Sequence, residues 1–308
     1  MNTNDLLRML ETVLPLFVML GLGMLCRKKR LFTPEGIAAL KFLVVSITLP
    51  AVMFSAFAAA EYSASSFIVP ASIFLTCAAA LALGFGFCRM LGIKGRLTPF
   101  LASGFEAGML GYALFALLFP EESASSFAII DLGQVLFVFT VYKALLSGGG
   151  GIKSVLSDAL RSPVIWAVAS GLIFGACGIY GALSDLGLNG IIDGITGFAA
   201  APTSAVILLT IGYDLTPGEI QWKSTLCFAG LRAAVMGILF SIVLFVNKTL
   251  LNGAMHTGAL ALMFILPPPF VLPVFARVDS ERTNIVSAIS ALTLLCVLLF
   301  AALTFVFA

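Results

Sequence analysis

The sequence predicts an all-α integral membrane protein with ten transmembrane helices, arranged as two inverted five-helix repeats. The composition is 60% hydrophobic and 10% charged, with a mean hydropathy of +1.11, whereas an ordinary globular domain is about 25% charged. Apolar runs long enough to cross a hydrocarbon core of about 30 Å recur along the chain. Glycines or prolines interrupt two of these runs, the fourth and the ninth, at equivalent places in the two halves.

Ten apolar runs can each supply a transmembrane helix of about 20 residues. The predicted spans are 5–26, 34–58, 67–90, 99–119, 127–146, 163–184, 191–213, 224–246, 254–276 and 284–307. Hydroxyl side chains directly before a proline, at Thr33, Thr98 and Ser162, are expected to cap three of these helices. Because basic residues follow the first run instead of preceding it, we interpret that run as a retained span and not as a cleaved signal peptide.

Lysine and arginine are concentrated in alternate loops, which the positive-inside rule assigns to the cytoplasm. These loops hold 14 of the 17 basic residues: Arg27, Lys28, Lys29, Arg30, Lys41, Arg89, Lys94, Arg96, Lys143, Lys153, Arg161, Lys223, Arg277 and Arg282. The opposite loops hold only Arg8 and Lys248, beside several acidic residues. The sequence therefore predicts a multi-pass protein of the cell (inner, cytoplasmic) membrane with both termini outside the cytoplasm.

The two halves of the chain share landmarks. Pro50 in the second span matches Pro202 in the seventh, and the glycine-broken fourth span matches the proline-broken ninth. Since five spans per half is an odd number, the second copy enters the membrane in the opposite orientation, as in many secondary transporters. We predict a first repeat at 1–146, a glycine-rich cytoplasmic linker at 147–161 and a second, inverted repeat at 162–308.

Glu106 lies in the middle of the fourth apolar run, flanked by Gly104, Gly108 and Gly111. A charged side chain at mid-bilayer costs roughly 3 kcal/mol on insertion scales, so it normally faces the interior of a helix bundle or a wet cavity. Glycines permit the helix to unwind, but unwound backbone persists only where protein or water satisfies it. The fourth span is therefore predicted to be a broken helix that lines a site. A structural salt bridge from Glu106 to a neighbouring span is the alternative.

Two further ionisable residues interrupt apolar runs, Asp131 in the fifth span and Arg232 in the eighth. If Arg232 pairs with one carboxylate, the other acid lies in a low-dielectric setting that favours its neutral form, so that it can carry a proton. We expect Glu106, Asp131 and Gln134 to couple proton or sodium movement to transport, with no other cofactor and no metal. Alternatively, Asp131 bonds within its own helix near Gln134, and Arg232 snorkels towards the cytoplasm.

The predicted substrate site combines both breaks with Arg232, because a guanidinium and the amino ends of half-helices offer positive potential to a carboxylate. Its residues are Gly104, Phe105, Glu106, Gly108, Gly111, Arg232, Pro267, Pro268, Pro269, Phe270 and Pro273. An enzyme is not expected, since the sequence has no His-Glu-x-x-His motif and no nucleotide-binding loop. The six cysteines are scattered among apolar residues without a Cys-x-x-Cys pair, so they indicate neither a disulfide framework nor a metal site.

Several motifs, in order along the chain, resemble the auxin efflux carrier family, which includes bacterial permeases and the plant PIN-type auxin exporters. They are Leu14-Pro15-Leu16-Phe17 with Gly21-Leu22-Gly23, then Thr48-Leu49-Pro50-Ala51-Val52-Met53-Phe54, Gly104 to Gly111, Asp131-Leu132-Gly133-Gln134, Ala201-Pro202-Thr203 and Ile211-Gly212-Tyr213-Asp214-Leu215. The resemblance covers nearly the whole chain. It implies a fold similar to that of the bile acid sodium symporters, with the fourth and ninth spans crossing at their breaks. Glu106 stands where the family pattern usually has an asparagine.

The resemblance also implies a mechanism. Spans one, two, six and seven would form a scaffold, and spans three to five and eight to ten a transport bundle that moves against it as an elevator. The function predicted is a secondary active transporter of a small organic anion, auxin-like or dicarboxylate-like, with proton coupling. A channel, or a transporter of a neutral or cationic molecule, is the alternative. The expected partners are a small organic solute and the lipid bilayer, with a homodimer left open and no nucleic acid.

Overall fold

The computed structural model describes residues 3–60, 62, 65–146, 157, 160–215, 218, 222–275 and 279–307; most of these residues are helical, and no strand occurs among them. The first-half elements are α1 (Thr3–Lys28), α2 (Pro34–Leu43), η1 (Val44–Thr48), α3 (Leu49–Ala58), α4 (Ser65–Met90), η2 (Thr98–Ala102), η3 (Ala107–Gly111), α5 (Tyr112–Leu118), α6 (Ser125–Phe137), η4 (Val138–Tyr142) and α7 (Lys143–Leu146). The second-half elements are α9 (Pro163–Ala176), α10 (Ile179–Asp185), α11 (Asn189–Ala200), α12 (Thr203–Asp214), α13 (Trp222–Thr249), α14 (Thr257–Ile265), η6 (Leu272–Phe275) and α15 (Asp279–Phe307).

Seven helical segments of the described chain are long and apolar enough to cross a membrane. They are Pro34–Ala58, Phe67–Met90, Thr98–Leu118, Ser125–Leu146, Asn189–Asp214, Thr225–Thr249 and Thr283–Phe307. An eighth results if α9 and α10, which are bent by 59° to one another, count as one span. The protein is therefore a multi-pass helical membrane protein. The first and ninth predicted spans are not among these segments, so the count of ten and the inverted repeat stay predictions.

The predicted domain boundaries stay predictions as well. Most of the linker predicted at 147–161 lies outside the described residues, namely 147–156 and 158–159. The described chain on either side ends at α7 and begins again before α9.

Of the three predicted capping hydroxyls, only Thr33 makes the expected bond. Its Oγ1 accepts a hydrogen bond of 3.1 Å from the Gly36 N–H at the start of α2. Ser162 is the N-cap of α9 but accepts no cap bond, and Thr98 is already the first residue of η2. The prediction of a cap was wrong at these two positions, where the proline that follows still begins the helix because its φ is preset.

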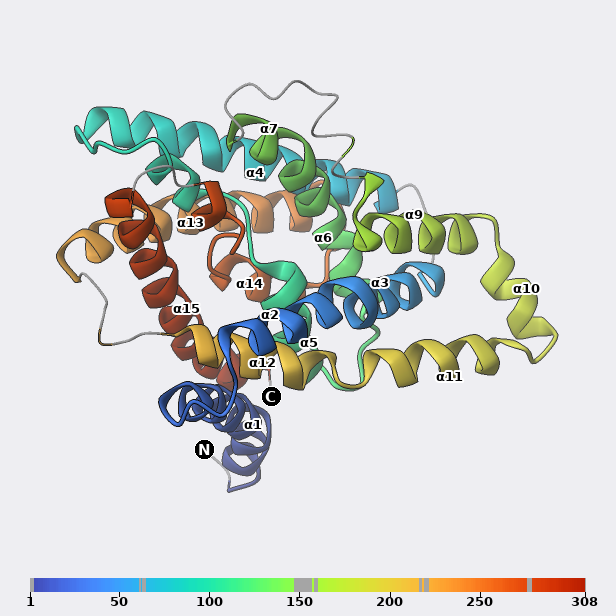
Figure 1. The fold of residues 1–308 in the computed structure, drawn as a ribbon. Helices are drawn as coiled ribbons and strands as arrows, with labels where there is room; N and C mark the ends of the chain where they lie inside the picture. The colour runs from blue at the N-terminus through green and yellow to red at the C-terminus, as the bar shows by residue number, and fades with distance from the viewer. Residues whose placement is uncertain are drawn as a thin grey trace.

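The helices pack in two sets (Figure 1). In the first set α1 lies along α12, and α3 lies along α9 and α11. In the second set α4 packs on α6 and α13, and α13 also packs on α15. The approach of α1 to α12 is close, because a Cβ added to Gly23 or Gly212 would overlap the partner helix's backbone. Small residues at a membrane helix interface allow such an approach, which explains the glycines of two of the quoted motifs.

Two interrupted segments lie between these sets. In the fourth segment, η2 ends at Ala102 and helix resumes at Ala107, while in the ninth, α14 ends at Ile265 and only the short η6 follows. In the fourth segment 72% of the most apolar window is buried, compared with 28 to 44% in the other six spanning segments. The glycine-rich break is therefore in the interior of the protein, where its backbone groups need protein partners.

Candidate functional site

Glu106 connects the two breaks. Its backbone N–H donates a 2.8 Å hydrogen bond to the carbonyl oxygen of Pro267. Its carboxylate accepts one hydrogen bond from the Met109 N–H at 3.3 Å and another from the Phe270 N–H. Glu106 is thus the N-cap of the helix that resumes at Ala107, and it also satisfies the first free N–H after the prolines of the ninth segment. A negative side chain is favourable at such a position.

Gly104 occupies a conformation that only glycine adopts readily. Its φ is +70°, and a Cβ placed there would lie 2.9 Å from Cγ of Pro269. The glycine therefore serves both the left-handed turn of the fourth segment and its contact with the ninth.

Arg232 of α13 forms hydrogen bonds with the backbone at both breaks. Its guanidinium donates three hydrogen bonds of 2.8 Å, to the carbonyl oxygens of Leu101, Gly104 and Leu266. These carbonyls lie at or just beyond the carboxyl ends of η2 and α14, where a cation is stabilising and where orphan acceptors need donors. The side chain is only 4% exposed, so it does not snorkel. Among the described residues no ion pair joins it to Glu106 or Asp131.

Asp131 and Gln134 approach the first break from α6. The Gln134 side-chain N–H donates to the Phe105 carbonyl oxygen at 2.6 Å. Three buried oxygens have no hydrogen-bond partner within the described chain: both carboxylate oxygens of Asp131 and the Gln134 Oε1. The Tyr112 hydroxyl lies next to Asp131 without the geometry of a full hydrogen bond. The alternative in which Asp131 bonds to Gln134 is therefore not observed.

A cavity of about 480 Å³ opens beside Glu106. One wall comes from α2, η1 and α3 with the near ends of α9 and α12, and the other from the two breaks, α6 and η4. Of the predicted site residues it brings together Phe105, Glu106, Gly108, Gln134, Pro269 and Phe270.

The remaining predicted residues do not line this cavity. Gly104, Gly111, Asp131, Pro268 and Pro273 lie outside it, and Arg232 and Pro267 line a separate apolar cavity of about 440 Å³ among α13, α14 and α15. Gly111 instead provides packing space, since a Cβ there would come within 2.7 Å of the Phe127 ring. Arg232 therefore does not line the cavity beside Glu106.

Three short π-helical segments, η1, η3 and η4, border the cavity. Each contributes lining residues: Val45 from η1, Met109 from η3, and Val138 with Phe139 from η4. A π-segment widens the helix locally and frequently marks a functional site. The sequence carried no signal for these segments, because a wider turn depends on what the helix packs against.

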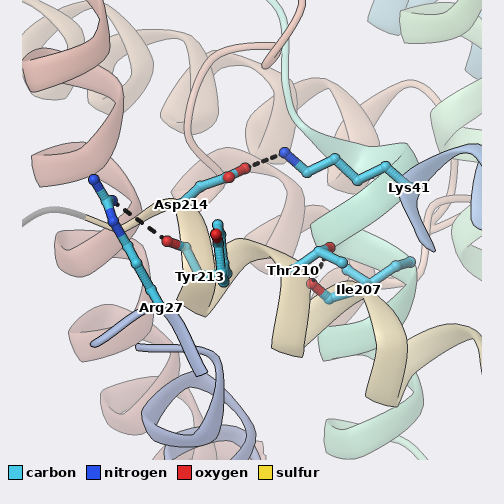
Figure 2. A network of polar contacts seen from close by, with 6 residues as sticks. All are labelled: Arg27, Lys41, Ile207, Thr210, Tyr213 and Asp214. Carbon is cyan, nitrogen blue, oxygen red and sulfur yellow. Dashed lines mark hydrogen bonds and ion pairs between the residues drawn. The ribbon is translucent and has the colours of Figure 1, made fainter. Parts of the chain in front are cut away.

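The cavity also contains an ion pair that sequence reasoning did not assign to the site. Lys41 of α2 bonds to the carboxylate of Asp214, the last residue of α12, and both line the cavity. Figure 2 shows Lys41 reaching across to Asp214, with Arg27 of α1 directed at the Tyr213 carbonyl, 3.4 Å away. A lysine within an apolar run and an acid at the end of one were the available signals. In the sequence, Lys41 serves only as one of the basic residues that mark the cytoplasmic side.

The chain is similar to a protein of Methanothermobacter thermautotrophicus described as an uncharacterized transporter. The two are 27% identical over 212 residues, which cover 67% of each chain. The chain matches no protein-family model. The similarity supports a membrane transporter, and the resemblance to the auxin efflux carrier family stays a prediction.

Proposed function

We propose that this protein is a secondary transporter and that its solute binds in the cavity beside Glu106. The observation that carries the proposal is the meeting of two broken helical segments at one buried carboxylate, which caps one break and accepts an N–H from the other. Broken helices that meet near the middle of the membrane are the usual sites of solute and ion binding in transporters with repeated halves.

Alternating access would come from movement between the two sets of helices. The cavity separates α2, α3, α9 and α12 from the breaks and α6, so sliding of one set past the other would carry a bound solute with the breaks. The Lys41–Asp214 pair lies at the end of α12, close to Arg27 in the basic last turn of α1. By the positive-inside rule this end faces the cytoplasm, and the structure would then be an inward-open state.

Asp131 is the proposed carrier of the coupling ion. A buried carboxylate is costly unless it is paired, protonated or bound to a cation, and Asp131 makes no hydrogen bond to the described residues around it. The neighbouring Gln134 Oε1 is also a free acceptor. Either a proton or a sodium ion would satisfy these oxygens, since hard cations prefer carboxylate and amide oxygens.

The test is flux into proteoliposomes that contain the purified protein. A panel of malonate, malate, indole-3-acetate and tetraethylammonium is offered with an imposed proton or sodium gradient. Saturable flux of a panel member that follows one gradient is the expected result. Unitary currents, as a channel gives, or flux that does not saturate would contradict a carrier.

Two variants separate coupling from binding. Asp131→Asn resembles the neutral acid, so we expect it to exchange solute across the membrane but to lose gradient-driven accumulation. Asp185→Asn, at an exposed aspartate of α10, is the matched control and should behave like the parent protein. Unchanged accumulation by Asp131→Asn would contradict the coupling role.

A further inference from the structure

The charges that line the cavity indicate the class of solute that it can bind. The backbone N–H groups expected to bind a solute anion already bond to a carboxylate of the protein. In a broken-helix transporter the free N–H groups after each break are the natural partners of a solute carboxylate. Here the Met109 and Phe270 N–H groups both donate to the carboxylate of Glu106 itself. A solute anion would have to displace this covalently attached one, whose effective concentration is much higher.

The two basic side chains near the site, Arg232 and Lys41, already have partners within the protein. The three hydrogen bonds from Arg232 go to backbone carbonyls, and the side chain lines a different cavity. Lys41 is the basic residue of the Glu106 cavity, and it is paired with Asp214. Among the described lining residues the formal charges are therefore two carboxylates and one ammonium, which leaves one negative charge at Glu106.

The rest of the lining suits a cation with an apolar body. Phe105, Phe139 and Phe270 line the cavity together with Met53 and Met109. Aromatic faces attract organic ammonium ions, most strongly where water is excluded. Each oxygen of Glu106 accepts one backbone hydrogen bond and keeps further lone pairs for an ammonium N–H. A cavity lined by a carboxylate and three phenyl rings is complementary to an organic ammonium and opposed to a dicarboxylate.

From these contacts we infer that the cavity binds an organic ammonium cation, with Glu106 as its counter-ion and the three phenylalanines around its apolar part. The inference rests on the proposed transport function and narrows its solute class. It reverses the sign of the solute that the sequence indicated, because the Glu106 carboxylate occupies the anion position and Arg232 does not line the cavity.

The experiment measures thermal unfolding of the full chain in detergent at constant pH and constant sodium chloride. Tetraethylammonium and butylammonium are titrated as cationic probes, and malonate as the anionic probe. Ligands that bind the folded state raise the unfolding temperature in a saturable manner. We expect both ammonium ions, and not malonate, to give such a rise.

Variants assign the response to the cavity. Glu106→Gln should weaken the ammonium response roughly tenfold or abolish it, since the counter-ion is lost. Phe139→Leu, which leaves the breaks intact, should weaken it by roughly threefold and serves if Glu106→Gln does not fold. Glu35→Gln, at an exposed glutamate of α2 outside the cavity, is the control and should respond like the parent protein.

Three results would overturn the inference: a saturable shift with malonate and none with ammonium, no shift with either class, or an ammonium shift unchanged in both cavity variants. None of these results bears on the proposed transporter function, which the flux measurement tests separately. Saturable malonate flux in the proteoliposomes, for example, would retain the carrier and reject the cationic solute.

Discussion

The break in the fourth segment keeps its backbone N–H groups, whereas the break in the ninth has three successive prolines without any. At the glycine break both donors and acceptors are freed, and other parts of the protein must satisfy them. Gln134 donates to the Phe105 carbonyl and Arg232 to the Gly104 carbonyl, while the Ser103 hydroxyl ties the break to α4 by donating to the Cys77 carbonyl. At the proline break there are carbonyls to satisfy but few N–H groups, because proline has none.

The two breaks are complementary for this reason. The Glu106 N–H of the first meets the Pro267 carbonyl of the second, and the Phe270 N–H of the second returns to the Glu106 carboxylate. Three further carbonyls at or beside the two breaks accept hydrogen bonds from one guanidinium, that of Arg232. A glycine break therefore depends on its surroundings more than a proline break does, because it also has N–H groups to satisfy. The largest loss of stability is expected for the residue that supports both breaks. Smaller losses are expected for residues that support the glycine break alone, and the smallest for residues that support neither.

Removal of Arg232 should have the largest effect on stability. Arg232→Met leaves three buried carbonyls without their donor, at about 1–3 kcal/mol for each unsatisfied group, so we expect a loss of at least about 3 kcal/mol. Arg232→Lys should recover only part of it, because an ammonium lacks the planar fork. Thermal unfolding in detergent measures both, with Arg89→Met at an exposed position of α4 as control. If Arg232→Met and Arg89→Met have the same unfolding temperature, the hydrogen bonds of Arg232 contribute little to stability.

A side chain at Gly104 should have the next largest effect. Gly104→Ala meets both the positive φ and the Pro269 ring, and we expect a loss of about 1–3 kcal/mol. Gly86→Ala in α4 is the matched control, since nothing lies within 4 Å of the added methyl. That change should be neutral or stabilising by up to about 1 kcal/mol. Equal unfolding temperatures for the two variants would mean that the turn at Gly104 is not constrained.

A smaller effect is expected at Gln134, which supports only the glycine break. Gln134→Leu removes the donor to the Phe105 carbonyl but also removes the unsatisfied Oε1, so the net loss should be about 1 kcal/mol. Thr140→Val in η4, where the exposed hydroxyl bonds to its own helix, should change stability by less than about 0.5 kcal/mol. A loss at Gln134 as large as that at Arg232 would contradict the proposed division of support.

The smallest effect on stability should come from the ion pair at the cavity mouth. Lys41 and Asp214 are 36% and 53% exposed, and exposed pairs contribute about 0–1 kcal/mol. A double-mutant cycle with Lys41→Met and Asp214→Asn should therefore give a coupling free energy below about 1 kcal/mol. A larger coupling would indicate that the pair holds α2 to α12 and is part of the packing between them.

Several features of the site could be predicted from single residues. Glu106 between glycines and the prolines at 267–269 indicated both breaks, because few physical settings accept such residues inside an apolar segment. The partners of the charged groups could not be predicted in the same way. Arg232 was expected near a carboxylate or at the membrane surface, and it bonds instead to carbonyls contributed by two other segments.

The sequence by itself determined the class of protein, the extent of seven apolar helices and the places where two segments break. These properties depend on composition and on local backbone chemistry, which each stretch of chain carries alone. Only the tertiary structure decided which groups of the two breaks bond to one another. In particular, it decided that the Glu106 carboxylate of the fourth segment accepts the Phe270 N–H of the ninth. The reason is physical: a buried donor or acceptor is satisfied by whatever packing brings within about 3 Å, and that packing joins residues more than a hundred positions apart.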